Sequence, residues 1–248
     1  MLYTVDGLVL QAKNYGENDK LVTVLTADGK QTLIAKGVRS MKSKYKNITE
    51  PFVYANFELN QKGSAIAWIK GGSSIEIFYN LREDVGKLFL ATYVCDVANE
   101  LSGERVECTD MLRLTLNTLY AIMNDMRPLS QIKAVFEMRA MCLSGFEPDV
   151  FGCAVCGKES AENAMFSING GIVHCHSCPP GTAGVSLPVC ADAQQAIRHI
   201  VLSEPKQIFS FEMDEKAEKQ LWDIAEAYLS AQLERGFRSL DYWKTIKI

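Results

Sequence analysis

Four cysteines carry the clearest chemical signal in the sequence. They form two Cys-x-x-Cys pairs, Cys153 with Cys156 and Cys175 with Cys178, and eighteen residues separate the two pairs. Thiolates are preferred ligands of structural zinc, and two such pairs at this separation are typical of a site with four thiolate ligands. The spacing therefore predicts a structural Zn²⁺ held by these four cysteines.

Other chemistry fits the cysteine pattern less well. A thioredoxin-type redox centre uses one pair at the start of a helix, whereas both pairs here lie among strand and turn residues. A catalytic zinc needs an open coordination position, which four thiolates do not leave, and the His-x-Glu element of zinc deaminases is missing. An iron–sulfur or redox role and catalysis remain as alternatives. Because four cysteines complete the ligand set, we expect His174 and His176 to face solvent or to lie beside the ligands.

The segment between the two pairs predicts how they meet. The run NAMFSINGGIVHC contains two short strand-like stretches joined at Asn169-Gly170, and both residues tolerate the positive φ of a tight hairpin turn. A hairpin at this point returns the chain and brings the second pair to the first. We therefore expect a zinc-ribbon-like insertion at residues 150–182.

The first 80 residues favour strands. Short runs rich in β-branched and aromatic residues are separated by turn signals such as Asp28-Gly29 and Gly71-Gly72. In the fourth run, Val53, Ala55, Phe57 and Leu59 alternate with more polar positions, as in a half-buried strand. Five or six strands without a helix between them predict a small closed barrel of the OB or SH3-like kind. The expected strands are 2–11, 20–27, 31–36, 52–60, 64–70 and 73–79.

The period of the apolar residues changes to 3.6 from about Leu81, which predicts helices. Pro128 with Ser130 indicates a helix start capped by serine, and Gly145 with Pro148 indicates a stop. The whole chain is thus expected to be an α+β multidomain protein, with an all-β barrel at 1–80 and a helical domain at 81–248 that contains the cysteine insertion. The expected helices are 81–101, 109–125, 130–149, 191–203 and 214–237.

Charge is distributed unevenly along the chain. The net charge of −4 argues weakly against a nucleic-acid partner, yet residues 1–80 hold ten Lys or Arg and seven Asp or Glu. The barrel is therefore positive, and the remainder is acidic. The first residues lack the basic start and apolar run of a signal peptide, and no run of 18 apolar residues occurs, so we expect a cytoplasmic protein without a membrane segment.

The densest cationic stretch is AKGVRSMKSKYKN, with no acidic residue between Lys30 and Thr49. Cations at this density bind phosphates and release counterions, and an aromatic ring beside them can stack on a base. A solvated loop that keeps the barrel soluble is the alternative, and charge alone does not decide between them. Tyr15, Tyr54 and Trp68 are further candidate stacking residues. The candidate DNA-binding residues are Lys36, Arg39, Lys42, Lys44, Tyr45 and Lys46.

Several motifs together resemble the RecO family of bacterial DNA repair and recombination-mediator proteins. They are YGENDK, TADGK and AKGVRSMKSKYK, followed by a helical region with CAVCG and CHSC, and they occur in the order and at the spacing of the family. The resemblance covers essentially the whole chain. It implies an N-terminal OB-fold and a helical domain with a four-cysteine zinc element, in which the cysteines at 153, 156, 175 and 178 are ligands and Lys36 to Lys46 contact DNA.

The resemblance also implies a function without catalysis. Members bind single- and double-stranded DNA, anneal complementary strands, and work with RecR to load RecA on strands coated by single-stranded DNA-binding protein. They dock the acidic, hydrophobic tail of that protein on the helical domain. Lys133 and Arg139, cations on one expected helix, are candidate contacts, and surface solubility explains them equally well. Such a protein would be cytoplasmic and associated with the nucleoid during repair.

A different class of function also agrees with the pattern. A zinc-stabilised protein–protein adaptor would use the barrel to bind peptides, and its cations would be incidental. Binding that survives an excess of oligonucleotide would favour the adaptor, and binding that an oligonucleotide abolishes would favour the DNA-binding mediator. No enzyme motif competes with either, since Gly-x-Ser-x-Gly is missing and only three histidines occur.

Overall fold

A computed structural model of the chain describes residues 1–63, 65–161 and 163–246. The chain divides into two compact units, the first formed by Met1–Met123 with Ser239–Ile248 and the second by Asn124–Arg238. The expected domain boundary at residue 80 lies just after the last barrel strand. It stays a prediction, because helices after residue 80 belong to the same compact unit as the barrel.

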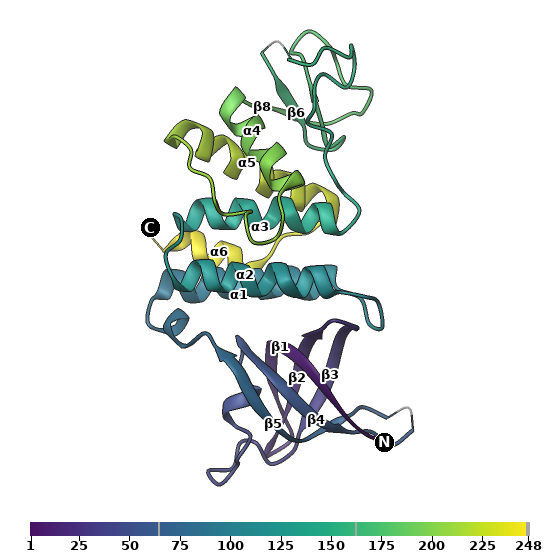
Figure 1. Cartoon of the computed structure of the whole chain (residues 1–248), viewed down its shortest axis with the longest axis vertical. Coiled ribbons are helices and arrows are strands. Elements are labelled where there is room, and N and C mark those ends of the chain that lie inside the picture. Colours follow the sequence, from purple (N-terminus) through teal and green to yellow (C-terminus); the bar gives the residue numbers. More distant parts are fainter. Residues whose placement is uncertain (64, 162, 247–248) are drawn as a thin grey trace. The chain divides into compact units, whose positions relative to one another are not determined.

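Five strands of the first unit close into a barrel (Figure 1) in the order β1-β2-β3-β5-β4. The first strand bends at a bulge, so that residues 2–8 pair with β4 and residues 7–15 pair with β2. The barrel closes where β3 and β5 pair in parallel at Ile34 and Trp68. This is the five-stranded arrangement of an OB-fold, as expected. The strands are β1 (Leu2–Tyr15), β2 (Asp19–Thr26), β3 (Gly29–Ala35), β4 (Val53–Asn60) and β5 (Trp68–Ile77).

The expected turn at Gly71-Gly72 is wrong, because both residues lie inside the continuous strand β5. A side chain on Gly72 would collide with the carbonyl oxygen of Asn56, and one on Gly71 would collide with the Glu58 carboxylate. Glycine here permits close approach of β4 and β5 at a bulge and does not mark a reversal. The last two expected strands are therefore one; Ser64, where the earlier of them was to begin, lies outside the described residues.

The barrel core follows the alternation read from the sequence. Val53, Ala55, Phe57 and Leu59 of β4 are all buried, which confirms the expected inward face of that strand. Their side chains meet buried residues of the other strands, because successive side chains of a strand point to opposite faces of a sheet. These core residues include Val9, Val22, Val24, Leu33, Ala35 and Ile69.

Helices of the first unit follow the barrel. They are η2 (Tyr79–Arg82), α1 (Val85–Leu101), α2 (Thr109–Met123) and, near the C-terminus, α6 (Arg238–Thr245), which was not expected from the sequence. The TADGK motif joins the barrel to the α1–α2 connection. The Lys30 amide donates to the Gly103 carbonyl at 2.9 Å, and the Cys108 amide donates to the Ala27 carbonyl at 2.7 Å. Gly29 has φ +113° and no room for a side chain, so glycine is required at this turn.

The second unit contains α3 (Leu129–Leu143), α4 (Ala191–Leu202) and α5 (Glu215–Leu233). The expected serine cap of α3 is wrong: Pro128 is the N-cap, and the Ser130 hydroxyl instead bonds the Glu218 carboxylate of α5. The expected stop is confirmed, since α3 ends before Gly145, which has φ +86°. Asp214 caps α5 by accepting a hydrogen bond from the Ala217 amide.

A small sheet in the second unit carries the cysteine insertion. Its strands β6 (Met165–Ser167), β7 (Ile172–His174) and β8 (Ser186–Pro188) lie in the order β7-β6-β8. The hairpin of β6 and β7 is confirmed, but its turn is wider than a two-residue Asn-Gly turn. The positive φ of this turn falls on Gly171, at +61°, where a side chain would collide with Tyr228. Within the insertion, Glu162 lies outside the described residues.

No helix in the described part of the chain is both long enough and apolar enough to cross a membrane.

Candidate metal centre and nucleic-acid interface

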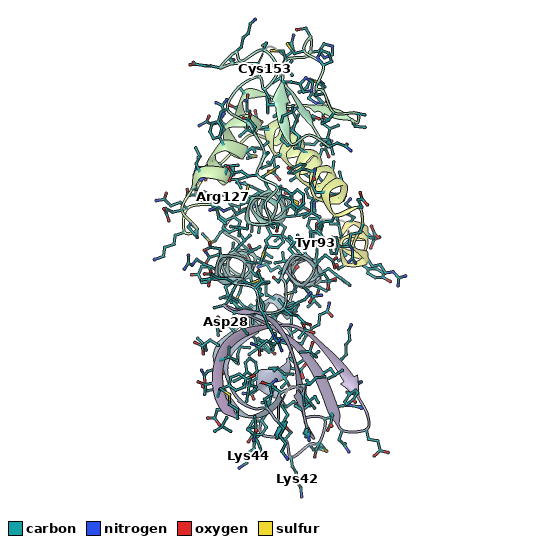
Figure 2. The ribbon with its side chains drawn as sticks, turned by 90° about the vertical axis from the view of Figure 1, so that its right-hand side faces the viewer. Asp28, Lys42, Lys44, Tyr93, Arg127 and Cys153 are labelled. Carbon is teal, nitrogen blue, oxygen red and sulfur yellow. The ribbon has the colours of Figure 1, made fainter. Side chains whose placement is uncertain are left out.

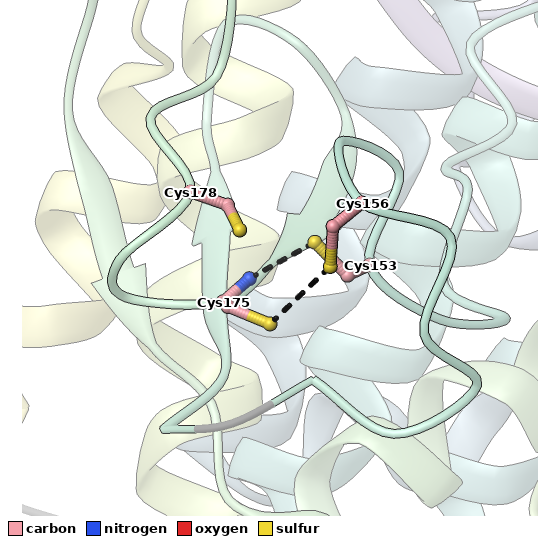
Figure 3. Close-up of side chains that lie close together, drawn as sticks. All are labelled: Cys153, Cys156, Cys175 and Cys178. Carbon is pink, nitrogen blue, oxygen red and sulfur yellow. Dashed lines mark hydrogen bonds between the residues drawn. The ribbon is translucent and has the colours of Figure 1, made fainter.

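The structure brings the four cysteines of the sequence pattern together. The sulfur atoms of Cys153, Cys156, Cys175 and Cys178 all lie within 4.8 Å of one another (Figure 3). Cys153 and Cys175 are buried, whereas Cys156 is exposed. The cluster is therefore open to solvent on one side only.

Backbone hydrogen bonds shape each Cys-x-x-Cys pair into a tight turn. The Gly157 amide donates to the Cys153 carbonyl at 2.9 Å, and the Cys178 amide donates to the Cys175 carbonyl at 3.0 Å. The two turns are held to each other, since the Cys175 amide donates to the Cys153 sulfur at 3.3 Å and the Ala154 amide donates to the Val173 carbonyl at 2.9 Å. The β6–β7 hairpin thus places the second turn opposite the first.

The pKa values of the thiols show that the cluster favours a bound cation. Backbone amides, chiefly that of Cys156, lower the pKa of the Cys153 thiol to about 6. The pKa of the Cys178 thiol is raised to about 11, mainly by burial and to a lesser extent by the neighbouring sulfur atoms of Cys156 and Cys153. One thiolate is stabilised while a neighbour is kept protonated, because burial disfavours a charged sulfur and adjacent negative charges repel each other. A bound divalent cation would offset this repulsion and allow all four thiols to ionise.

The donor set and its spacing fit a tetrahedral metal ion. Zinc–sulfur bonds of about 2.3 Å place the sulfur atoms of a tetrahedral site about 3.8 Å apart. The sulfur atoms of Cys156 and Cys175 lie 4.0 Å apart, close to that separation. Four cysteines at these positions could hold one metal ion and would leave it no open coordination position.

The two neighbouring histidines lie outside this set of sulfur ligands. His174 is buried, with Nδ1 at 2.8 Å from the Cys175 carbonyl and Nε2 at 2.9 Å from the Ser186 hydroxyl. It therefore ties β8 to the end of β7. His176 is exposed. Both positions agree with the expectation that neither histidine replaces a cysteine.

The second candidate site is the cationic loop, residues 36–46, which leaves the barrel after β3. Figure 2 shows Lys42 and Lys44 projecting from one end of the barrel, while Asp28 of the β2–β3 turn lies at its other end. Lys36, Arg39 and Lys46 are exposed as well. In the part of the chain that the structure describes, no ion pair joins any of the four lysines to an acidic residue.

The YGENDK motif positions this loop. Asp19 accepts a hydrogen bond from the Gly37 amide at 2.7 Å, and the Asn18 carbonyl accepts one from the Arg39 amide at 3.0 Å. The Arg39 guanidinium donates to the Glu17 carbonyl at 2.8 Å. Beyond the loop, Lys20 and Glu50 form an ion pair at 2.8 Å. The β1–β2 turn therefore holds the base of the loop, and Arg39 takes part in that support.

Tyr45 lies differently from the other candidate DNA-binding residues. Its ring is half-buried and packs against the barrel core, a cluster that also contains the buried side chains of Val38 and Ile48. Val38 and Tyr45 therefore anchor the loop to the core. The ring of Tyr45 therefore offers less free surface to a base than the sequence pattern suggested.

The structure overturns the expected surface position of Lys133. Its side chain has no exposed area, and its ammonium lies 2.8 Å from Glu137, 2.9 Å from Glu226 and 4.5 Å from the centre of the Trp222 ring. A cation enclosed by helices α3 and α5 is not available to a partner's tail. Arg139 donates to the Ile200 and Val201 carbonyls at 2.9 and 2.6 Å, and so caps the end of α4.

Taken together, these features define a class of protein. It has a five-stranded OB-type barrel with an exposed cationic loop, followed by helices that carry a four-cysteine candidate metal centre. Comparison with known proteins narrows the class. Residues 1–78 match the family model described as Recombination protein O N terminal, and residues 82–241 match the one described as Recombination protein O C terminal.

Curated relatives agree with both family models over the full length. A DNA repair protein RecO from Acetivibrio thermocellus is 31% identical over 97% of this chain and 95% of its own. Another from Alkaliphilus metalliredigens is 29% identical over 99% of this chain and 100% of its own. A third, from Symbiobacterium thermophilum, is 25% identical over 99% of this chain and 98% of its own. The chain belongs to the RecO family of DNA repair proteins.

Proposed function

We propose that this chain is a DNA-binding mediator of recombinational repair that acts without catalysing a reaction. The exposed cationic loop carries the proposal: Lys36, Lys42, Lys44 and Lys46 lie outside the barrel, on a segment whose base is fixed by Asp19. Ammonium groups in such a position bind phosphates as point charges. The names of the relatives, which are DNA repair proteins, support the same role.

The loop would bind the phosphate backbone without reading sequence. Four lysines that each neutralise one phosphate of a single strand give a salt slope of about −2.8 in log affinity against log salt concentration. Arg39 would mainly hold the loop in place, since its guanidinium already donates hydrogen bonds to the β1–β2 turn. Both single- and double-stranded DNA present the phosphates that such a loop binds.

We further propose that the four cysteines hold a structural Zn²⁺. Four thiolates suit zinc and leave no position for a substrate, so the ion would stabilise the element and perform no reaction. The element would then give the second unit a fixed surface for partners. The family suggests RecR, the tail of single-stranded DNA-binding protein and, indirectly, RecA as those partners, with annealing of complementary strands as the resulting activity.

Substitution of the loop lysines tests the DNA-binding role. We expect K42A/K44A/K46A to weaken binding of labelled single-stranded and duplex oligonucleotides, measured by fluorescence anisotropy at low salt. The matched control is K206A/K216A/K219A, which removes the same charge from exposed positions of the second unit. Equal affinities for the loop variant, the control and the unaltered chain would exclude the loop as a phosphate-binding site.

A competition experiment with an oligonucleotide and a protein partner separates the mediator from an adaptor. If an excess of oligonucleotide leaves binding of a protein partner unchanged and the chain itself binds no DNA at low salt, the adaptor function replaces the proposed one. If DNA binds and the loop variant binds it less well, annealing of two complementary labelled strands is the next assay. The variant should then anneal more slowly in proportion to its lost affinity.

A further inference from the structure

A row of side chains crosses the outer face of the barrel where β3 and β5 close it. Lys13 of β1 pairs with Leu21 of β2, Leu21 pairs with Ile34 of β3, and Ile34 pairs with Trp68 of β5. Directly paired residues of neighbouring strands have their side chains on the same face. These four residues therefore form one line across four strands.

Burial shows that the line faces outward. Val22, Leu33 and Ile69, which adjoin members of the row along their strands, are all buried in the barrel core. Because side chains alternate along a strand, the members of the row point away from that core. Leu21, Ile34 and Trp68 are only half-buried, so they form an apolar floor on the outer surface of the barrel.

Cations surround this floor. The Lys36 ammonium lies over the Trp68 ring, 5.1 Å from its centre, so a base that stacks there displaces it toward a phosphate. Lys70 is exposed two residues further along β5, at the bulge of that strand. Lys13 is exposed at the far end of the row. The nearby Asp19 carboxylate is engaged by the Gly37 amide and supports the cationic loop, which begins at Lys36. Three positive charges around an aromatic and aliphatic surface are complementary to a nucleotide, with bases over the floor and phosphates at the rim.

From this arrangement we infer that the outer face of β2, β3 and β5 binds unpaired bases, with Trp68 as the stacking residue. The inference rests on the proposed DNA binding and makes it specific for single strands. In a duplex each base is already covered on both sides by its neighbours, so its face cannot reach an indole fixed on a barrel strand. Lys36 connects this floor to the cationic loop, so one strand could contact both. Tyr45 is not the stacking residue, because its ring packs against the core.

Tryptophan fluorescence tests the contact directly in the full-length chain. Unlabelled oligothymidylate should quench the emission of the unaltered protein, and Trp68→Phe should remove that change, although Trp222 and Trp243 remain. Binding of a labelled oligonucleotide is followed in parallel by anisotropy. Quenching that persists undiminished in Trp68→Phe would overturn the assignment of Trp68.

Affinity measurements test the single-strand selectivity. Trp68→Ala should weaken single-strand binding about tenfold, the loss typical of one stacked base, and should leave duplex affinity and the salt slope unchanged. Trp68→Leu keeps apolar volume at the barrel closure and should give the same result if the alanine variant does not fold. Tyr79→Ala, at a 61% exposed ring outside the row, is the matched control and should change neither affinity.

The outcomes separate this inference from the function on which it rests. If the unaltered chain binds no DNA at low salt, the proposed function fails. If it binds single strands with a steep salt dependence but the Trp68 variants bind equally well, the lysines act alone and only the stacking site is refuted. An equal loss of single-strand and duplex affinity in Trp68→Leu would also refute it.

Discussion

Lys133 lies at the centre of a buried cluster of charges in the second unit. Its ammonium contacts Glu137 on the same helix and Glu226 on α5, and it lies over the face of Trp222. A buried ammonium is tolerated only where opposite charges and hydrogen bonds replace its water. The side chain therefore fixes the packing of α3 against α5 and does not serve as a surface contact.

Truncation of Lys133 should be costly. Lys133→Ala removes the cation from a Glu137 carboxylate that has no exposed area, and we expect a loss of about 3–5 kcal/mol in the free energy of unfolding of the second unit. Native-state hydrogen exchange of the α3 amides would measure it. The double variant K133M/E137M, which removes the two fully buried charges and keeps the volume, should lose much less. A free energy of unfolding of Lys133→Ala within about 1 kcal/mol of the unaltered chain would contradict this reading.

At the scale of elements, the cationic loop depends on the β1–β2 turn. Asp19→Ala removes the acceptor of the Gly37 amide and should loosen the base of the loop, whereas Asp19→Asn keeps a side-chain oxygen and serves as the control. A hydrogen bond to a charged group contributes about 1.5–3 kcal/mol, enough to change the local opening of a loop. Trypsin should therefore cleave after Lys42 and Lys44 faster in the alanine variant, as mass spectrometry would show. Equal cleavage rates in all three proteins would mean that other contacts suffice.

The cysteine element makes a separate prediction about metal. The purified chain should contain one metal ion, and Cys178→Ser should lower its occupancy, whereas Cys190→Ser, at a cysteine outside the cluster, should not. Metal removal by a chelator should increase hydrogen exchange at the Ala154 and Cys175 amides, which join the two turns, and should leave the barrel unchanged. Unfolding of the barrel on chelation would contradict a local structural role.

Local patterns predicted the elements and the cysteine cluster well. The alternation in β4 and the helical period of α2 are properties of neighbouring residues, and a hairpin is enough to bring Cys175 to Cys153. The turn at Gly71-Gly72 was wrong because glycine allows both a reversal and a close approach of strands, and only the partner strand distinguishes them. Helix α6 was not predicted because it spans only eight residues, although its buried residues Ser239, Leu240 and Trp243 do follow helical spacing.

Contacts between distant residues explain what the sequence could not predict. Lys133 reads as a surface cation until Glu226, more than ninety positions away, is placed beside it. The row from Lys13 to Trp68 likewise depends on the register of four strands. Period-two alternation indicates that each member of the row lies on the outer face of its strand. The sequence does not say which outer residues of different strands become neighbours.

At the scale of the whole molecule, charge is divided along the chain. The positive balance of residues 1–80 contrasts with the acidic remainder and with the net charge of −4. We expect such a division to confine the proposed phosphate binding to the barrel, because an acidic surface repels the backbone of DNA. Added salt should therefore weaken DNA binding by screening a few barrel cations rather than a broad basic surface.

The slope of log affinity against log salt concentration tests this account most directly. Anisotropy of a labelled single-stranded oligonucleotide, titrated with the unaltered chain and with K42A/K44A/K46A over a range of salt concentrations, gives the slope for each protein. The account predicts a slope of about −3 for the unaltered chain and a slope shallower by about 2 for the variant. Identical slopes, or no binding at low salt, would contradict the claim that the loop lysines hold DNA.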